Sequence, residues 1–307
     1  MSRFLFLPRS PTAQSYKSIA FVREPYARLL SAYVDKLFTP RADTWHKYAK
    51  PALEYARPGA SRLERACSHN VTFPELVRYF IRTELDGLDV HSDRSTRRRR
   101  DEHFAPISQQ CNFCGTSYDF LGRQETFAED TLGILAQLNI SVVLTFSDLD
   151  KEHEKYEMAT LIRYTFENEI VQVADTRGCM PREEVLRRLW KAFQIRGTLG
   201  AEEFFPLAPS DTLNISKEDF LKIAMKAYDR SAGVPKRKSN KEESMLEAYS
   251  MISRPNRLLL RRIFDEDFKF FGYNPDHPLV FPPEDEFELP YYRYFDVFDS
   301  FLYSDVL

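Results

Sequence analysis

The chain has 307 residues, which suits a single α/β enzyme, and 43% of them are hydrophobic, enough for a sizeable core. Its formal net charge of −3 lacks the broad basic surplus of a nucleic-acid-binding protein. No stretch reaches the ~18 consecutive apolar residues of a membrane span, and the opening MSRFLFLPRSP is too short to predict a signal peptide.

The first predicted unit is a strand followed by a helix. Ser18–Arg23 (SIAFVR) is a short apolar run and reads as a buried strand. Pro25 suits the first turn of a helix, and the residues after it repeat their apolar side chains at helical spacing. That inward side contains Leu29, Leu30, Tyr33, Val34 and Leu37.

A second strand–helix unit lies further along the chain, after an amphipathic helix predicted over Phe73–Leu85. Tyr118–Gly122 reads as a strand, and Thr126 to Glu129 has the spacing of a capping box. The helix that this box opens is expected to turn Phe127, Leu132, Ile134, Leu135 and Leu138 inward. Ser141–Phe146 (SVVLTF) is the third predicted strand.

The rest of the chain is predicted to be mostly helical. One helix starts at Pro181, a second is capped by Ser216 and runs to Arg230, and a third over Asn256–Phe271 ends at Gly272. The apolar side of the first helix is predicted to contain Val185, Leu186, Leu189, Trp190 and Phe193. Residues 284–307 form an acidic, aromatic tail. Strands alternating with helices predict an α/β protein whose mostly parallel central sheet is flanked by helices in three layers.

Four cysteines and three glycosylation acceptors bear on the compartment. Cys67, Cys111, Cys114 and Cys179 allow two disulfides in three connectivities, and no second pair or nearby His completes a zinc site, so we expect no metal. The triplets at Asn70, Asn139 and Asn214 fit Asn-x-Ser/Thr, a pattern that also arises by chance. Together these features favour a secretory lumen.

The end of the first strand is the best candidate binding site. Arg23 can fork onto a phosphate, and Ser31 lies in the second turn of the next helix with Arg28 three residues before it on the same face. These groups can converge on one anion near the helix start. The spacing alone fits an ordinary strand–helix unit with solvated side chains better than it fits a binding site.

FVREPYARLLSAYVDK (residues 21–36) resembles the 3′-phosphate-binding segment of sulfotransferases that use 3′-phosphoadenosine-5′-phosphosulfate (PAPS). It is most similar to the Golgi carbohydrate sulfotransferases that include the chondroitin 4-O- and HNK-1 sulfotransferases. Three further segments resemble that family in the same order: VTFPELVRYFI (71–81), HFAPISQQCNFCGTSYDFLGRQETFAED (103–130) and FDEDFKFFGY (264–273).

The resemblance implies a P-loop-like fold and transfer of sulfate from PAPS to a glycan hydroxyl in the Golgi, without a metal. The acceptor is expected to be a glycan, including anionic glycosaminoglycans of the chondroitin or dermatan type, and not a nucleic acid. Arg23 and Ser31 would hold the 3′-phosphate. His103, in the segment that matches the family's H-W-x-P, is the candidate base, although a structural histidine that hydrogen-bonds the loop is the favoured interpretation.

The resemblance also implies roles for other residues. Cys111 and Cys114 match a family C-x-x-C and are expected to form disulfides, with Cys67 and Cys179 as possible partners. Tyr118, Gly122, Arg123 and Glu125 lie where the family's segment passes the nucleotide, and we favour structural roles for Tyr118 and Glu125. The run Arg97–Arg100 could contact an anionic glycan, or be a solvated loop.

The family places a basic 5′-phosphosulfate loop and a membrane anchor upstream of Ser18, and residues 1–17 reproduce neither. We therefore expect one sulfotransferase-like domain over 1–307 that lacks this loop, a truncated chain with little transfer activity, whose full-length form would be membrane-anchored. The alternative is a catalytically inactive homologue that binds a nucleotide or a glycan. A P-loop kinase is disfavoured because no G-x-x-x-x-G-K-S/T occurs.

Overall fold

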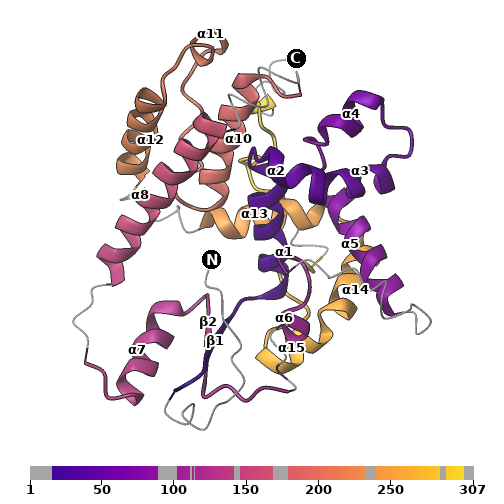
Figure 1. Cartoon of the computed structure of the whole chain (residues 1–307), viewed down its shortest axis with the longest axis vertical. Helices are drawn as coiled ribbons and strands as arrows, with labels where there is room; N and C mark the ends of the chain where they lie inside the picture. The colour runs from indigo at the N-terminus through magenta and orange to yellow at the C-terminus, as the bar shows by residue number, and fades with distance from the viewer. Residues whose placement is uncertain are drawn as a thin grey trace.

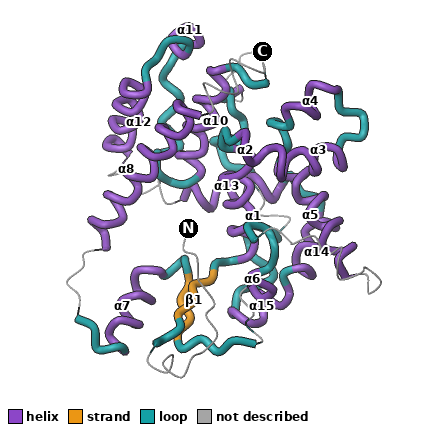
Figure 2. The backbone as a smooth tube through the Cα atoms, viewed as in Figure 1, coloured by secondary structure: helices purple, strands orange, loops and turns teal. Residues whose placement is uncertain are grey.

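The computed structural model describes residues 16–88, 102–110, 113, 115–141, 146–168, 179–231, 239–283 and 288–300. Helices dominate this part of the chain, and the strands form one short ribbon (Figures 1 and 2). In chain order the elements are β1 (Ile19–Val22), α1 (Pro25–Tyr33), the π-helical turn η2 (Val34–Phe38), α2 (Ala42–Thr44), the π-helical turn η3 (Trp45–Ala49), α3 (Lys50–Ala56), α4 (Arg62–Cys67), α5 (Phe73–Leu88), α6 (Ile107–Gln110), β2 (Phe120–Arg123), α7 (Phe127–Gln137), α8 (Phe146–Tyr164), α10 (Arg182–Ile195), α11 (Pro209–Thr212), α12 (Lys217–Ser231), α13 (Ser239–Ser250), α14 (Arg254–Ile263) and α15 (Asp265–Phe271).

The two strands pair in parallel, in a register that places Phe21 opposite Gly122. A glycine is needed there, because a Cβ at position 122 would lie 2.3 Å from the Phe21 ring. The fold is thus helix-rich with a small parallel sheet, compatible with the α/β class predicted from the sequence. Three layers and a P-loop-like topology stay predictions.

Helix α1 forms as its sequence predicts. Pro25 occupies its first turn, where a missing N–H costs nothing, and Glu24 caps it by accepting a 2.6 Å hydrogen bond from the Ala27 N–H. The five apolar residues expected to face inward are all buried: Leu29, Leu30, Tyr33, Val34 and Leu37. The helix therefore starts close to the end of β1. The hydrogen bond at its N-cap and the burial of its apolar side hold it there.

The main core is one continuous cluster contributed by most of the helices. The predicted apolar side of α10 is at its centre, with Leu186, Leu189 and Trp190 at most 1% exposed. Rings from distant segments meet there, such as Tyr26 of α1 and Tyr249 of α13, whose hydroxyl donates to the Tyr26 carbonyl. This core includes the buried side of α1, the helix that follows β1.

Three predictions about local structure are wrong. Phe127 and Leu132 of α7 are more than two-fifths exposed, because α7 lies beside a two-stranded ribbon with little surface to cover. Thr126 makes no capping bond to the helix backbone, since its hydroxyl donates to Asp130 instead. The single helix expected over 256–271 is two helices, α14 and α15, that meet at Phe264, and Gly272 ends the second as predicted.

The third predicted strand falls largely on residues 142–145, which lie outside the described residues. Its last residue, Phe146, begins α8. No helix in the described ranges combines the length and apolarity needed to cross a bilayer.

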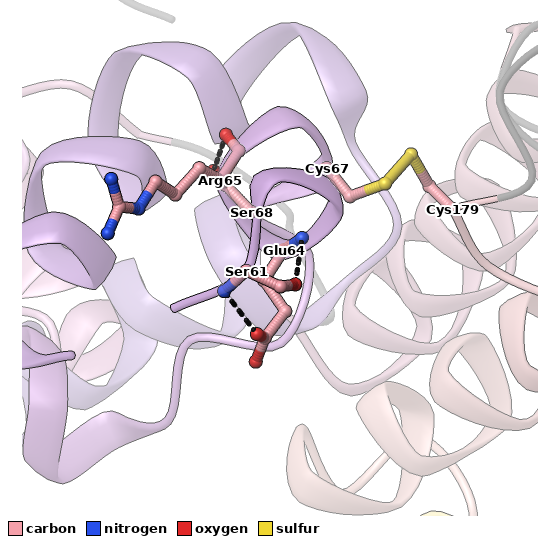
Figure 3. Close-up of a disulfide and its surroundings, with 6 residues drawn as sticks. All are labelled: Ser61, Glu64, Arg65, Cys67, Ser68 and Cys179. Atoms are coloured by element: carbon pink, nitrogen blue, oxygen red, sulfur yellow. Dashed lines mark hydrogen bonds between the residues drawn. A yellow bond between two sulfur atoms is a disulfide. The ribbon is translucent and has the colours of Figure 1, made fainter. Parts of the chain in front are cut away.

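A disulfide joins Cys67, at the end of α4, to Cys179, in the segment before α10 (Figure 3). The first turn of α4 is fixed by a capping box, in which Ser61 and Glu64 exchange hydrogen bonds. The sequence left the connectivity open, and this bond excludes pairing of Cys67 or Cys179 with the remaining two cysteines. Cys111 and Cys114 lie outside the described residues.

Candidate functional site

Arg23 follows the last residue of β1, and its side chain is half-buried. Within the described part of the chain it forms neither a hydrogen bond nor an ion pair of 4.0 Å or less, although Glu125 and Glu24 lie close enough to influence it. Burial lowers the pKa of Arg23 from its ordinary value, because the charged form loses hydration. A half-buried cation that pairs with no described residue is a strong candidate to bind an anion.

Ser31 lies two turns into α1 and is half-buried. No hydrogen bond of its hydroxyl to another described residue is present, so the group can donate to a ligand. Strand β1 and helix α1 are consecutive elements, so both predicted phosphate ligands come from one rigid unit. That Arg23 and Ser31 hold a 3′-phosphate stays a prediction.

Arg28 points to a neighbouring loop. Its two terminal nitrogens each donate a 2.6 Å hydrogen bond to a backbone carbonyl, one of Glu102 and one of Ala105. Between these carbonyls lies His103, whose ring is edge-on to Tyr48 with centroids 6.2 Å apart. Arg28 thus fixes the His103 loop onto α1 and connects the predicted base with the predicted phosphate ligands. Its own role in phosphate binding stays a prediction.

Glu125, which follows β2, is the carboxylate with the largest electrostatic effect on Arg23. One of its carboxylate oxygens accepts a 2.8 Å hydrogen bond from the Glu24 N–H, and the other accepts one of 2.8 Å from the Tyr273 hydroxyl. These bonds hold the carboxylate near Arg23 without an ion pair to it. The sequence favours a structural role for Glu125 and does not single out Glu24 or Tyr273. Their membership of the recognised motifs is the one signal that could have pointed to them.

Three of the four recognised segments meet at this place, below the start of α1 in Figure 1. Asp267 of α15 is fully buried and accepts hydrogen bonds of 2.8 Å from the N–H groups of Ile107 and Ser108, which begin α6. A small second core cluster packs Val22 of β1 against Ile107 and Phe271. Residues separated by more than 100 positions are therefore joined into one scaffold behind Arg23.

Arg123 strengthens the same scaffold. Its guanidinium donates a 2.7 Å hydrogen bond to the Phe271 carbonyl and lies 5.0 Å from the centre of the Tyr273 ring. These contacts hold the Arg123 side chain at the C-terminal end of α15. Gly122, the neighbouring residue, acts through its lack of a side chain, as the contact with Phe21 shows.

A second group of charges lies toward α10. Asp35 of η2 pairs with Lys36 at 2.8 Å and with Arg196, the residue after α10, at 3.2 Å, while Arg41 approaches to 3.6 Å. These cations lower the pKa of Asp35, although burial opposes them. Arg196 is also close enough to lower the pKa of Arg23, so positive potential extends from this group to the site.

The predicted glycosylation sites differ in exposure. Asn139 and Asn214 are exposed, whereas Asn70 is half-buried, and its buried Oδ1 atom has no partner among the described residues.

Two further predictions concern the arginine run and metal binding. Residues 97–100 are outside the described ranges. Among the described residues, no group of three or more His, Cys, Asp or Glu side chains is arranged to hold a metal ion.

Comparison with known proteins gives this arrangement a family. The profile of the sulfotransferase family matches residues 6–193, which is more than half of the chain. The chain belongs to the sulfotransferase family. The matched region contains β1, α1, the His103 loop and β2, so Arg23, Ser31 and Glu125 all lie within it.

Known relatives of this sulfotransferase are carbohydrate sulfotransferases. Carbohydrate sulfotransferase 8 of Mus musculus is 32% identical over 152 residues, covering 49% of this chain and 33% of the relative. Carbohydrate sulfotransferase 14 of Danio rerio is 30% identical, covering 48% and 37%, and carbohydrate sulfotransferase 11 of Rattus norvegicus is 33% identical, covering 43% and 36%. The similarity thus spans about a third of each relative's length. No solved structure matches significantly.

Proposed function

We propose that this sulfotransferase binds PAPS and transfers its sulfate to a hydroxyl group of a glycan. The observation that carries the proposal is the Arg23 guanidinium, half-buried at the end of β1 with no ion-pair partner among the described residues. The names of the relatives support a carbohydrate acceptor. The residues that match the family's phosphate-binding segment support PAPS as the donor.

Arg23 would neutralise the 3′-phosphate of the donor, and the Ser31 hydroxyl would donate a hydrogen bond to it. Bound PAPS supplies the sulfuryl group. His103 would accept the proton of the acceptor hydroxyl as its oxygen forms the new bond to sulfur, while the bond from that sulfur to the 5′-phosphate oxygen breaks and adenosine 3′,5′-bisphosphate leaves. The loop of His103 suits this task because Arg28 fixes it to the same helix that holds Ser31.

The acceptor is proposed to be a glycan that can be anionic, with Arg97–Arg100 as a contact for its acidic groups. The location is proposed to be the Golgi lumen, with membrane anchoring in the full-length protein and glycans on the exposed acceptors Asn139 and Asn214. The disulfide between Cys67 and Cys179 supports an oxidising compartment. Residues 1–307 are proposed to fold as one domain, with 284–307 as its tail.

A thermal shift experiment with adenosine 3′,5′-bisphosphate tests donor binding. At a ligand concentration of 100 times Kd the protein should gain about 2.7 kcal/mol, a rise in melting temperature of roughly 5 °C. Arg23→Ala should abolish the rise and Ser31→Ala should reduce it. Arg62→Ala and Ser210→Ala, at exposed positions, are matched controls and should keep it. A folded wild type that gains no stability would contradict the proposal.

Transfer is tested separately on the full-length protein, with labelled PAPS and a panel of glycans that includes chondroitin and dermatan, because residues 1–307 are expected to have little activity of their own. His103→Ala should remove transfer while leaving the thermal shift intact, because the base does not hold the nucleotide. Binding of the bisphosphate without transfer to any glycan would favour the alternative function, an inactive homologue that binds nucleotides. Transfer that survives in His103→Ala would remove His103 from its assigned role.

A further inference from the structure

Glu24, between β1 and α1, is a carboxylate in an unusual position. It is only 6% exposed, and its Oε2 atom accepts the hydrogen bond that caps α1. Its Oε1 atom is buried and accepts no hydrogen bond from any residue within the described ranges. A buried carboxylate oxygen without a donor is costly when charged, so protonation of this group relieves a penalty that the fold otherwise bears.

The groups that face Glu24 come from every element packed around it. Tyr26 of α1 and Tyr249 of α13 are neutral at physiological pH, because burial raises the pKa of each. Glu125, after β2, adds a second carboxylate. Arg23 is the nearby cation, and Arg196 and Tyr273 act on it from α10 and from the end of α15.

A phosphate dianion at Arg23 would change the charge balance. Two carboxylates already neighbour this guanidinium, so full ionisation would leave four negative charges beside Arg23, with Arg196 as the next cation. Like charges at such distances in a poorly solvated site repel strongly. Protonation of the buried Glu24 removes one of these negative charges at little cost. Glu125 is exposed, so water stabilises its charge better.

We propose that Glu24 takes up one proton from solvent when the phosphate group of a nucleotide binds at Arg23. Glu24 is thereby part of the anion site, as the group that adjusts its charge to the ligand. The inference rests on the proposed function, because it requires a nucleotide phosphate at Arg23. It assigns to Glu24 a role in binding that its position as a helix cap alone does not require.

The ionisation of Glu24 supports this step. Burial, the largest effect, raises the pKa of Glu24 to about 7, and Glu125 adds to the rise. The carboxyl group is therefore close to half-protonated at neutral pH, and a further negative charge nearby completes the protonation. At pH 8 most molecules have an ionised Glu24 before the ligand arrives, so uptake is largest there.

Isothermal titration calorimetry of adenosine 3′,5′-bisphosphate at pH 8 measures the effect, since the phosphates are then ionised before and after binding. The titration is run in HEPES and in Tris, whose ionisation enthalpies differ. The expected result is a buffer-dependent enthalpy equivalent to uptake of roughly half to one proton per nucleotide. The affinity should also fall several-fold as the pH rises from 7 to 9.

Glu24→Gln keeps an oxygen for the Ala27 N–H but cannot titrate. It should bind the nucleotide with the same enthalpy in both buffers and with an affinity that is constant between pH 7 and 9. Glu54→Gln, at an exposed site on α3, is the matched control and should retain the uptake. Uptake that persists in Glu24→Gln would assign the proton to another group and overturn the inference.

The titration of the wild-type protein tests proton uptake even if Glu24→Gln folds poorly. Binding with no dependence on the buffer overturns the role of Glu24 and leaves donor binding intact. No binding at all by folded protein overturns the proposed function instead. The two failures are therefore distinguishable in one experiment.

Discussion

The Tyr273 hydroxyl donates a 2.8 Å hydrogen bond to Oε2 of Glu125, 148 positions earlier in the chain. The other oxygen of this carboxylate accepts the Glu24 N–H. Both oxygens are thus engaged, and Glu125 forms no ion pair with the neighbouring Arg23. Tyr273 thereby helps to keep the Arg23 guanidinium available for a ligand.

Tyr273→Phe should weaken binding of adenosine 3′,5′-bisphosphate about fivefold. Without the hydroxyl, one oxygen of Glu125 is released and can pair with Arg23, in competition with the phosphate, and a hydrogen bond of this kind contributes about 1 kcal/mol. Calorimetric Kd values check this. Tyr156→Phe, which removes an exposed hydroxyl on α8, should have no effect, and adding Glu125→Gln should restore affinity to the Tyr273 variant. Equal Kd values for wild type and Tyr273→Phe would sink the idea.

The sequence predicted local features well and long-range ones poorly. The strand–helix unit at Arg23 and the apolar side of α10 were recognisable, because helical periodicity and proline placement act over a few residues. The break at Phe264 and the exposure of Phe127 were missed, since both depend on what packs against a helix rather than on its own pattern.

The same distinction applies to the site. Arg23 and Ser31 stood out because they belong to one short motif. The bonds from Glu125 to Glu24 and to Tyr273 join residues 101 and 148 positions apart, and no local pattern encodes such pairs. The ordered motifs indicated that their segments matter together, and only the fold showed that they touch.

Asp267 is expected to be critical for stability. Asp267→Ala leaves the buried N–H groups of Ile107 and Ser108 without their acceptor and should lower the free energy of unfolding by roughly 3 kcal/mol. Asp265→Ala, two residues earlier, removes an exposed ion pair with Lys269 and should cost no more than about 0.5 kcal/mol. Denaturant unfolding of the two variants provides the comparison, and similar losses would argue against the proposed importance of Asp267.

The disulfide between Cys67 and Cys179 links segments 112 positions apart. Closing so long a loop restricts the unfolded chain, so the Cys67→Ser, Cys179→Ser double variant should lose roughly 4 kcal/mol of stability. Peptide mapping by mass spectrometry without reduction should find one linked peptide that contains both residues. A peptide joining either residue to Cys111 or Cys114 would contradict the structure.

The three Asn-x-Ser/Thr sites should differ in occupancy when the chain passes through a secretory pathway. Asn139 and Asn214 are exposed and can carry a glycan, whereas the amide oxygen of Asn70 is buried. Asn139→Gln and Asn214→Gln should each reduce the apparent mass by one glycan, and Asn70→Gln should leave it unchanged. Glycopeptide mass spectrometry measures this, and full occupancy of Asn70 would be the contrary result.

The raised pKa of Glu24 predicts a specific dependence of stability on pH. Its pKa is about 7 in the folded protein and about 4.5 ordinarily, so between these values the folded chain holds a proton that the unfolded chain has lost. The free energy of unfolding must then fall as the pH rises from 4.5 to 7, by about 3 kcal/mol from this group, and level off above 7. Glu24→Gln has no carboxyl group to titrate, so its free energy of unfolding should rise relative to that of wild type between pH 4.5 and 7. The difference should stay constant above pH 7.

Denaturant unfolding at pH 4.5, 5.5, 6.5 and 8 measures the difference, with Glu54→Gln as the control that should follow wild type. Curves for wild type and Glu24→Gln that run parallel from pH 4.5 to 8 would show that Glu24 ionises in the folded protein as it does in water.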